Sequence, residues 1–298
     1  MVKKYANHAY KSLTTQPPVT LIISFYKNTR MLDLVLASLI NQTYKNFGVI
    51  ICDDGSPAEI VALVHNQLEN LSIPCQHLWH EDIGFRKNRI LNWGIQNTTS
   101  DYLVFIDQDC ILHPEFMREH VEGKKENGVL CGRRINLTHT VSKLLSPKRV
   151  VSGFIEKNIW WILLAGLFMK DNNGIKGIYY RNPFLRMWAN QKPRGIVGCN
   201  FSLHRKNLLD INGFDTRYEG AGFGEDSDIE YRLTLNGVRM IPACNTTVQY
   251  HIYHRLLTRA SQNEALFDSV IHEKRARTNT GLSEQLNLSP ESDSDRCH

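Results

Sequence analysis

Tyr102-Leu-Val-Phe-Ile-Asp107-Gln-Asp109-Cys110 is the stretch from which the rest of this 298-residue chain can be interpreted. Its apolar run is rich in strand-forming residues and lacks helical periodicity, which predicts a buried strand. Asp107 and Asp109 then lie where this strand leaves the core. Neighbouring carboxylates repel each other unless a cation or hydrogen bonds compensate, and a divalent ion that carries phosphates fits this arrangement. A D-x-D pair also occurs by chance in polar turns, so the rest of the sequence must distinguish a metal site from a simple turn.

The composition of the chain is that of a soluble globular protein. Apolar residues make up 42% and charged residues 22% of the sequence, which is ordinary for this class. A net charge of +5 suits anionic substrates or a membrane surface but is too weak to indicate nucleic-acid binding. The seven scattered cysteines form no C-x-x-C pair, which favours a reducing compartment. The N-terminus lacks a signal-peptide core and no apolar run reaches about 18 residues, so we expect a cytoplasmic protein without a membrane span.

The first half of the chain alternates strand and helix patterns at short spacing. Strands are predicted at 19–24, 47–52, 73–78 and 103–106, and helices at 32–40, 57–68 and 87–96. This alternation predicts an α/β fold with a Rossmann-like, mostly parallel central sheet flanked by helices. In such sheets ligands bind outside the carboxyl ends of the strands. Asp53, Asp54, Asp107 and Asp109 all fall at such ends.

Residues 136–195 interrupt this pattern with a helical and aromatic insertion. The run Ile159-Trp160-Trp161-Ile-Leu-Leu-Ala-Gly-Leu-Phe168 is strongly apolar, and several lysines, arginines and tyrosines follow it. Two interpretations are open. The segment is either a helix that covers the core, or an aromatic and basic surface that contacts a membrane or a lipid-linked acceptor.

Two further polar clusters follow in the second half. Glycines within 220–224 precede Glu225 and Asp226 at the start of a predicted helix. Acidic residues are stabilising in a first helical turn, but closely spaced glycines also suit a loop whose backbone approaches a ligand. A last strand near 247–254 ends in His251 and His254, which are either structural or metal ligands.

Short motifs from about residue 19 to residue 254 occur in a characteristic order and spacing. They are Val19-Thr-Leu-Ile-Ile-Ser-Phe-Tyr26, Asp53-Asp-Gly-Ser56, Gly84-Phe-Arg-Lys87, Asn92-Trp-Gly-Ile95, Asp107-Gln-Asp109, Gly198-Cys-Asn-Phe-Ser202, Gly213-Phe-Asp215 and Gly224-Glu-Asp-Ser-Asp228. With these motifs the chain resembles an inverting glycosyltransferase of family 2 with a GT-A fold. Its second half is similar to the galactosyltransferase-type C-terminal segment of chondroitin-polymerase-like enzymes.

The resemblance implies a nucleotide-sugar site in the first half. An aspartate after the second strand would hydrogen-bond the nucleotide base, aromatic residues after the first strand would line its pocket, and an arginine would lie near the diphosphate or the donor sugar. The residues expected to contact the donor are Phe25, Tyr26, Asp53, Asp54, Arg86, Asp107 and Asn200.

The resemblance also implies a divalent metal. Asp109 and Asp107 would hold Mn²⁺ or Mg²⁺ on the diphosphate, with Asp109 the more direct ligand. His251 would be the third protein ligand, and His254 is the alternative. An imidazole ligand favours Mn²⁺ over Mg²⁺.

The acceptor side carries the expected catalytic pair. In transfer with inversion, Asp226 would act as the general base on the acceptor hydroxyl, while Glu225 would orient the acceptor. Phe223 and Gly224 are expected to line the acceptor site, although related enzymes often have tryptophan next to glycine in this loop.

These roles divide the chain into five segments. We expect a polar, loose N-terminal arm at 1–16, a nucleotide-sugar-binding half at 17–135, the insertion at 136–195, an acceptor and catalytic half at 196–273, and a disordered, flexible C-terminal tail at 274–298.

Two other functions are considered beside this resemblance. A nucleotidyltransferase would carry a glycine-rich basic loop after the first strand, and residues 25–30 contain no glycine. A non-catalytic sugar- or nucleotide-binding protein on the same fold would have lost one of the acidic pairs. The donor sugar, acceptor and linkage are not indicated, but a UDP-sugar and a glycan or lipid-linked glycan of bacterial polysaccharide or lipopolysaccharide synthesis fit the family.

Overall fold

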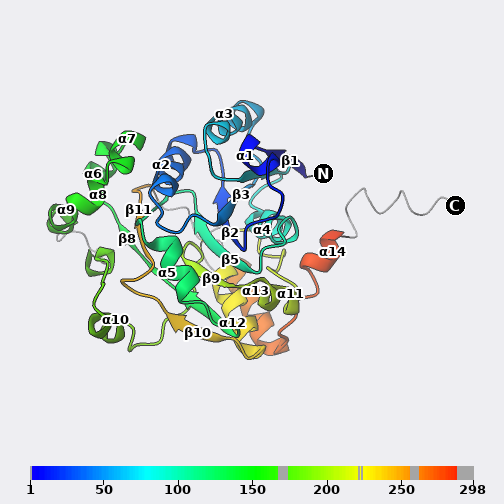
Figure 1. Ribbon diagram of the computed structural model, residues 1–298. Helices are drawn as coiled ribbons and strands as arrows, with labels where there is room; N and C mark the ends of the chain where they lie inside the picture. Colours follow the sequence, from blue (N-terminus) through cyan, green and yellow to red (C-terminus); the bar gives the residue numbers. More distant parts are fainter. Residues whose placement is uncertain (1, 167–173, 221, 223, 256–261, 287–298) are drawn as a thin grey trace.

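A computed structural model describes residues 2–166, 174–220, 222, 224–255 and 262–286. Its centre is an eight-stranded sheet (Figure 1). In spatial order the strands are β1 (Lys3–Ala6), β4 (Cys75–Trp79), β3 (Phe47–Asp53), β2 (Val19–Phe25), β5 (Tyr102–Asp107), β9 (Phe201–His204), β7 (Gly128–Cys131) and β10 (Arg239–Pro242). The four strands from β4 to β5 run parallel, whereas β1 and β9 are antiparallel to their neighbours. The expected α/β fold with a mostly parallel sheet is confirmed.

A second, three-stranded sheet continues from the carboxyl end of β5. It contains β6 (Cys110–Leu112), β11 (Val248–His251) and β8 (Arg133–Asn136) in the spatial order β6-β11-β8. Strand β11 runs antiparallel to β6, and their register sets His251 opposite Cys110. This pairing carries a residue of the second half of the chain to the D-x-D turn of the first half.

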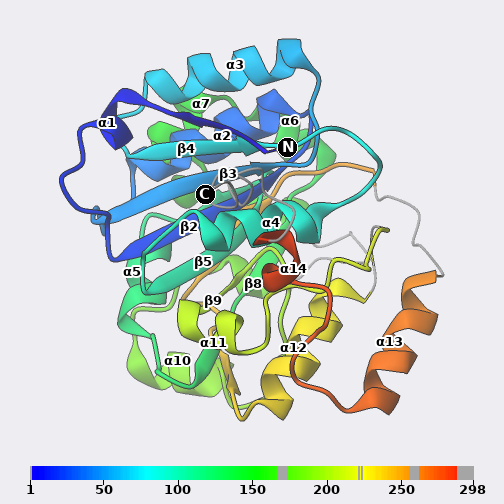
Figure 2. The ribbon, with the colours of Figure 1, turned by 90° about the vertical axis from the view of Figure 1, so that its right-hand side faces the viewer.

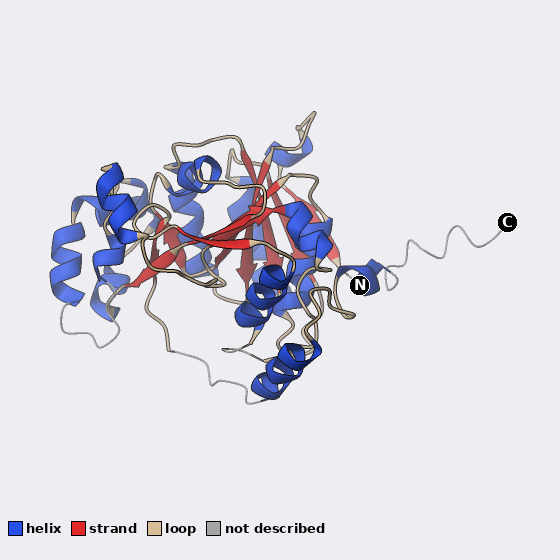
Figure 3. Ribbon diagram, turned by 90° about the horizontal axis from the view of Figure 1, so that it is seen from below, coloured by secondary structure: helices blue, strands red, loops and turns tan. Residues whose placement is uncertain are grey.

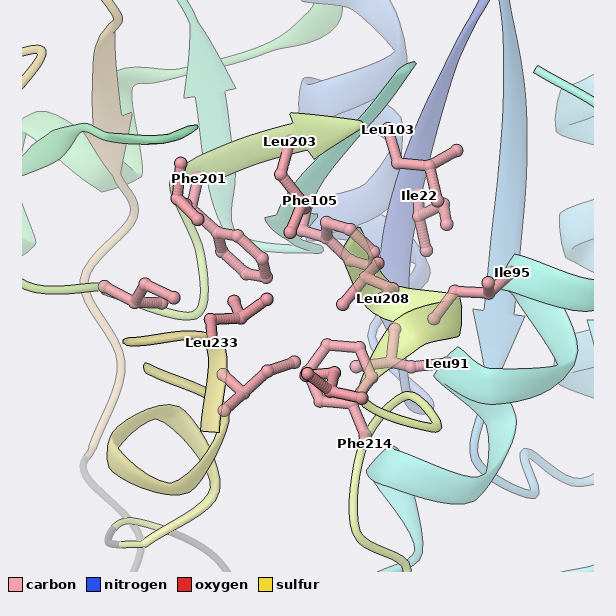
Figure 4. Close-up of a cluster of buried hydrophobic side chains, with 14 of the residues drawn as sticks. Ile22, Leu91, Ile95, Leu103, Phe105, Phe201, Leu203, Leu208, Phe214 and Leu233 are labelled. Atoms are coloured by element: carbon pink, nitrogen blue, oxygen red, sulfur yellow. The ribbon is translucent and has the colours of Figure 1, made fainter. Parts of the chain in front are cut away.

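Helices cover both faces of the large sheet (Figures 1 and 2). Successive residues of a strand point to opposite faces, so Leu21 and Ile23 pack in one core and Ile22 in another. The first core includes α2 (Thr29–Ile40), α3 (Ala58–Glu69) and α5 (Phe116–Glu122). The second core includes α4 (Lys87–Gln96), α11 (Arg205–Asp210), α12 (Glu225–Leu235) and α14 (Leu282–Leu286), and Figure 4 shows its side chains converging around Phe105, Phe201 and Phe214. The continuous apolar strands of the sequence are explained by this burial on two sides.

The insertion forms a group of short helices beside the small sheet. They are α6 (His139–Leu144), α7 (Pro147–Val151), α8 (Phe154–Lys157), α9 (Ile159–Gly166), the 3₁₀ helix η1 (Gly174–Gly177) and α10 (Pro183–Ala189). Val141, Val150, Ile155 and Ile162 join these helices to a third core under β11. Figures 1 and 3 place the group on the side of the molecule opposite the two termini.

Both ends of the chain differ from expectation. The N-terminal arm is ordered: β1 pairs with β4, and Asn7 precedes α1 (His8–Lys11) and donates to the Leu68 carbonyl. After α13 (Gln262–Glu273), the segment 274–286 is also folded, with Thr278 bonded to Asp215 and Leu282 buried. Both segments are held by hydrogen bonds more than by apolar contacts. Their polar composition therefore gives no sign that they are folded. The rest of the expected tail, 287–298, lies outside the described residues.

Within the described ranges, every helix is too short or too polar to cross a bilayer.

Candidate active site

Asp109, His251 and His254 form the most ligand-like cluster of the described chain. The Nε2 atoms of His251 and His254 lie 3.3 and 3.0 Å from Asp109 Oδ2, and 3.3 Å from each other. Ile252 N–H also bonds to the Asp109 carbonyl at 2.8 Å, which fixes the end of β11 against the D-x-D turn. One carboxylate oxygen and two imidazole nitrogens within 4.8 Å of one another are a donor set that fits a divalent metal.

The electrostatics of this cluster favour a charged Asp109. Burial alone raises the pKa of Asp109, but hydrogen bonds from His251 and His254 outweigh it and lower this pKa well below its usual value. The hydrogen bond to Asp109 in turn raises the pKa of His254. Both histidines approach Asp109, where we expected either one of them.

Asp107 is held by different partners and lies outside this three-residue cluster. Its Oδ1 atom accepts hydrogen bonds from Lys87 Nζ at 2.8 Å and from the Ser24 hydroxyl. Ser24 lies opposite Asp107 on the neighbouring strand β2, and Lys87 is the first residue of α4. The side chains of Lys87 and Asp107 remain 18% and 25% exposed, so a ligand can reach them.

Glu225 and Asp226 occupy the first turn of α12, as predicted. The preceding Gly224 has a φ of +102°, a conformation that glycine adopts without strain. Asp226 Oδ2 accepts the Gly198 N–H at 2.7 Å, and a Cβ atom on Gly198 would lie only 2.2 Å from Asp226 Oδ1. Glycine at position 198 therefore allows the first turn of α12 and the loop before β9 to approach closely.

Lys87 lies between Asp107 and the acidic pair of α12 and interacts with both. Burial alone lowers the pKa of Lys87, but Asp107, Glu225 and Asp226 outweigh this and raise it above its usual value. Burial raises the pKa of Glu225 to about 7 against the opposing charge of Lys87, with Asp226 adding to the rise. Burial likewise raises the pKa of Asp226. Residues from three separate elements thus share one electrostatic environment.

Arg134 extends this electrostatic environment to Asp109, His251 and His254, which we call the metal-type cluster. Its guanidinium is close enough to Asp107 and Asp109 for their charges to interact, and its charge also acts on Asp226. The D-x-D turn, the histidines at and after the end of β11 and the acidic turn of α12 therefore share one electrostatic environment. Among the residues that the structure describes, Glu225 Oε2 is buried there without a hydrogen-bond partner, so a ligand can supply one.

The two aspartates after β3 are bonded inside the protein. Asp53 is fully buried and bonds to His77 Nε2 at 3.0 Å and to the Ser56 N–H at 2.9 Å. Asp54 bonds to His80 Nε2 at 2.6 Å and to the Arg86 N–H at 2.8 Å. Asp54 therefore supports the loop that carries Arg86.

Tyr26 and Arg86, which are also expected to contact the donor, each bond to a neighbouring loop residue. Tyr26 is 39% exposed and donates to Asp82 at 2.9 Å, next to a cavity of about 370 Å³ lined by Lys27, Ser56 and Trp79. Arg86 donates to the Glu81 carbonyl, and its Nε atom is buried without a partner in the described part of the chain. These two side chains remain candidates for the donor site.

Phe25 and Asn200 are better explained as structural residues. Phe25 is 2% exposed and packs in the core with α2 and α3. Asn200 is fully buried; its amide donates to the Arg133 and Thr247 carbonyls and its oxygen lies 3.2 Å from His120 Nε2. With these groups used inside the protein, our expectation that both contact the donor is not supported. Phe223 lies outside the described residues.

Sequence reasoning assigned no role to Lys87, His77 or His80. Lys87 directly follows Arg86 in a quoted motif, and a basic residue between two acidic motifs is the signal that could have identified it. His77 and His80 flank the end of β4, next to the carboxyl end of β3. Their role as partners of the aspartates follows only from the order of the strands.

Comparison with known proteins identifies the class. The family described as Glycosyl transferase family 2 matches residues 20–201, more than half of the chain, and the chain belongs to this family. Residues 188–255 match the N-terminal domain of galactosyltransferase. The chain is thus a transferase enzyme, and the resemblance drawn from its motifs is confirmed.

Individual relatives are distant. The chain is 26% identical to chondroitin synthase of Escherichia coli over 226 residues, which cover 74% of this chain and 32% of that protein. It is 23% identical to validoxylamine A glucosyltransferase of Streptomyces hygroscopicus subsp. jinggangensis over 237 residues, covering 75% of this chain and 53% of that one. The chain thus spans about a third to a half of the length of these relatives.

Solved structures support the GT-A fold. The structure of S. aureus TarS 1–349 superposes with a TM-score of 0.54 at 14% identity, over 90% of this chain and 68% of that chain. Mannosyltransferase PcManGT from Pyrobaculum calidifontis, solved with GDP-Man and Mn²⁺, gives 0.52 at 17% identity, over 81% and 59%. At these identities the likeness concerns the fold alone.

Proposed function

We propose that this glycosyltransferase moves a sugar from a nucleotide-sugar, most simply a UDP-sugar, to a hydroxyl of a glycan acceptor, with inversion and with a divalent metal. The observation that carries the proposal is the meeting of Asp109, His251 and His254 with the acidic turn of α12 around Lys87 and Arg134. A metal-type donor set next to carboxylates of raised pKa matches the needs of this reaction.

Asp109, His251 and His254 would hold Mn²⁺, or Mg²⁺ in its place. When bound, the ion would neutralise negative charge on the leaving diphosphate. Lys87 and Arg134 would add fixed positive charge on the same side of the site, where they also balance Asp107. Tyr26, Asp54 and Arg86 would form the wall next to the nucleotide, with Asp107 between the nucleotide and the metal-type cluster.

Asp226 would take the proton of the acceptor hydroxyl as it attacks the anomeric carbon. Its Oδ2 atom is fixed by the Gly198 N–H, so the carboxylate is oriented before the acceptor arrives. Glu225, whose Oε2 has no hydrogen-bond partner in the described ranges, would hydrogen-bond the acceptor sugar. No covalent intermediate is required, because inversion needs a single displacement.

The acceptor would be a glycan or a lipid-linked glycan of bacterial polysaccharide or lipopolysaccharide synthesis. The relatives that are chondroitin synthases support a glycan acceptor. We place the reaction in the cytoplasm or on the inner face of the cytoplasmic membrane, which agrees with the six described cysteines being free and buried.

The test is an assay of nucleoside diphosphate release from a panel of UDP-, GDP- and dTDP-sugars, with Mn²⁺ and oligosaccharide acceptors. We expect acceptor-dependent release from one donor class, and nuclear magnetic resonance of the product should show an inverted anomeric configuration. Asp226→Asn should keep donor affinity and lose transfer by about 10²-fold to 10⁴-fold, because it removes the general base. Retained configuration, or an active Asp226→Asn protein, would contradict the proposed mechanism.

A further inference from the structure

Helix α10 turns its polar side chains toward the protein and its apolar side chains toward solvent. Arg186 donates to both carboxylate oxygens of Glu119, at 2.7 and 3.0 Å, and Asn190 exchanges hydrogen bonds with the backbone between β10 and β11. Phe184 and Trp188, two residues from these anchors along the helix, are 74% and 62% exposed. A surface helix of a globular protein normally has the opposite arrangement.

Helix α9 adds a second apolar surface on the same side of the molecule (Figure 1). Trp160 is 72% exposed and Leu164 59%, while Ile162 points into the core beneath them. The helix therefore covers the core with Ile162 and exposes an aromatic surface with Trp160. We call the exposed residues the α9–α10 face; they are Trp160, Trp161, Leu164, Phe184, Met187 and Trp188.

Positive charge is concentrated in the segment that carries this face. Residues 139–194 contain ten lysines and arginines against two acidic residues, a net charge of +8, although the whole chain carries only +5. The remainder of the chain is therefore slightly acidic. In the described part of this segment, the exposed basic residues are Lys143, Lys148, Arg149, Lys157, Arg181 and Lys192.

We propose that the α9–α10 face docks onto an anionic lipid bilayer. Tryptophan and phenylalanine side chains next to lysine and arginine are suited to the headgroup region, where apolar rings are buried and basic groups meet lipid phosphates. The same charge argues against a second copy of this chain as the occupant, because two such faces would repel each other.

Docking would bring the active site close to the lipid surface. Tyr253, between the two histidines of the metal-type cluster, donates its N–H to Ser142 of α6 at 2.9 Å, and its ring contacts His139 at 5.2 Å between centroids. The insertion is thus joined directly to the end of β11. An acceptor glycan on a membrane lipid could then reach Glu225 and Asp226; this last step rests on the proposed function, whereas the docking does not.

The experiment is flotation of the purified chain with lipid vesicles, without any sugar donor. We expect binding to vesicles of phosphatidylcholine mixed with phosphatidylglycerol, much weaker binding to phosphatidylcholine alone, and a decrease with added salt. Trp160→Ser/Trp188→Ser should lower the partition coefficient by about tenfold or more, because two interfacial anchors are lost. The control Leu235→Ser, which removes a 43% exposed leucine from α12, should leave binding unchanged.

A charge-reversal pair separates the electrostatic contribution. Lys148→Glu/Arg149→Glu should weaken binding to the mixed vesicles, while the exposed pair Lys124→Glu/Lys125→Glu, which lies before β7, should not. Unchanged binding by the tryptophan variant, or no binding of the wild type to mixed vesicles at low salt, would overturn the proposal. A dimer in sedimentation that the tryptophan variant dissociates would also overturn it, since the occupant would then be a second copy. Each outcome is independent of whether sugar transfer is observed.

Discussion

The carboxyl ends of β3 and β5 both carry two aspartates, but the structure uses the two pairs differently. After β3, Asp53 and Asp54 bond to histidines and to backbone N–H groups of neighbouring loops, and Asp53 is fully buried. After β5, Asp109 meets two histidines from the second half of the chain and keeps 13% of its side chain exposed. The first pair is bonded within the structure, whereas Asp109 of the second pair belongs to a candidate ligand set and Asp107 pairs with Lys87.

The difference shows that the neighbouring elements, and not the aspartates themselves, determine the role of an acidic pair. Strand β4 lies beside β3 and carries His77, whose ring bonds to Asp53 and helps to bury it. Beyond β5 the chain turns into β6, and β11 adds imidazoles whose nitrogen atoms a metal can also use. Substitutions in the two pairs should therefore have different consequences.

Asp109→Ala should give the largest effect, on activity. We expect metal-dependent turnover to fall by about a thousandfold or more, because a ligand that holds charge-neutralising metal contributes several kcal/mol to the transition state. Turnover at saturating Mn²⁺ measures this effect. Asp210→Asn, in an exposed ion pair of α11, is the control and should be fully active. Near-normal turnover of Asp109→Ala would remove Asp109 from the ligand set.

Asp53→Ala should act mainly on stability. The substitution leaves the Ser56 N–H and the His77 ring without their buried acceptor, which should lower the free energy of unfolding by about 3 kcal/mol. Urea unfolding of this variant beside Asp109→Ala measures the difference. If Asp109→Ala proved the less stable of the two, the assignment of one pair as support and the other as ligands would fail.

Glu225→Gln should have an effect on stability that depends on pH and reaches its full size only at high pH. The pKa of Glu225 is about 7 in the folded protein against an ordinary 4.5, so its stabilisation is complete below 4.5 and is lost as the pH rises through 7. Between about pH 4.5 and about pH 8 the wild type should lose up to about 3 kcal/mol relative to the variant, which cannot ionise. Urea midpoints at both pH values test this, with Glu122→Gln, an exposed glutamate of α5, as the control. Parallel pH profiles of wild type and Glu225→Gln would show that burial does not raise this pKa.

The sequence predicted the elements whose signals are local. The apolar runs of β2, β3 and β5 and the periodicity of α2 required no knowledge of their neighbours. Strand β1 and the segment 274–286 were missed, because they are held by backbone pairing and by hydrogen bonds such as Thr278 to Asp215. Polar composition gives no indication of such contacts.

The site could be predicted only in part, for a related reason. Asp109 and Asp226 were named because motifs carried them, and His251 was named because the resemblance implies a third ligand in its vicinity. The participation of both histidines depends on the β6–β11 register, and the role of Lys87 depends on α4 meeting α12 across more than a hundred residues of sequence. Asn200 lies in an equally clear motif, yet its partners are all internal. A motif identifies a residue, but the fold determines whether it faces a ligand.

The most direct test of the metal site is a thermal-shift measurement with UDP, GDP and dTDP, each with and without Mn²⁺, on the wild type and on Asp109→Ala. A ligand that binds only the folded state raises the unfolding midpoint by mass action. We predict that one nucleotide, UDP in the simplest case, raises the midpoint of the wild type only when Mn²⁺ is present, and that Asp109→Ala shows no such rise. An equal rise without Mn²⁺, or an undiminished rise in Asp109→Ala, would contradict a metal centre at Asp109, His251 and His254.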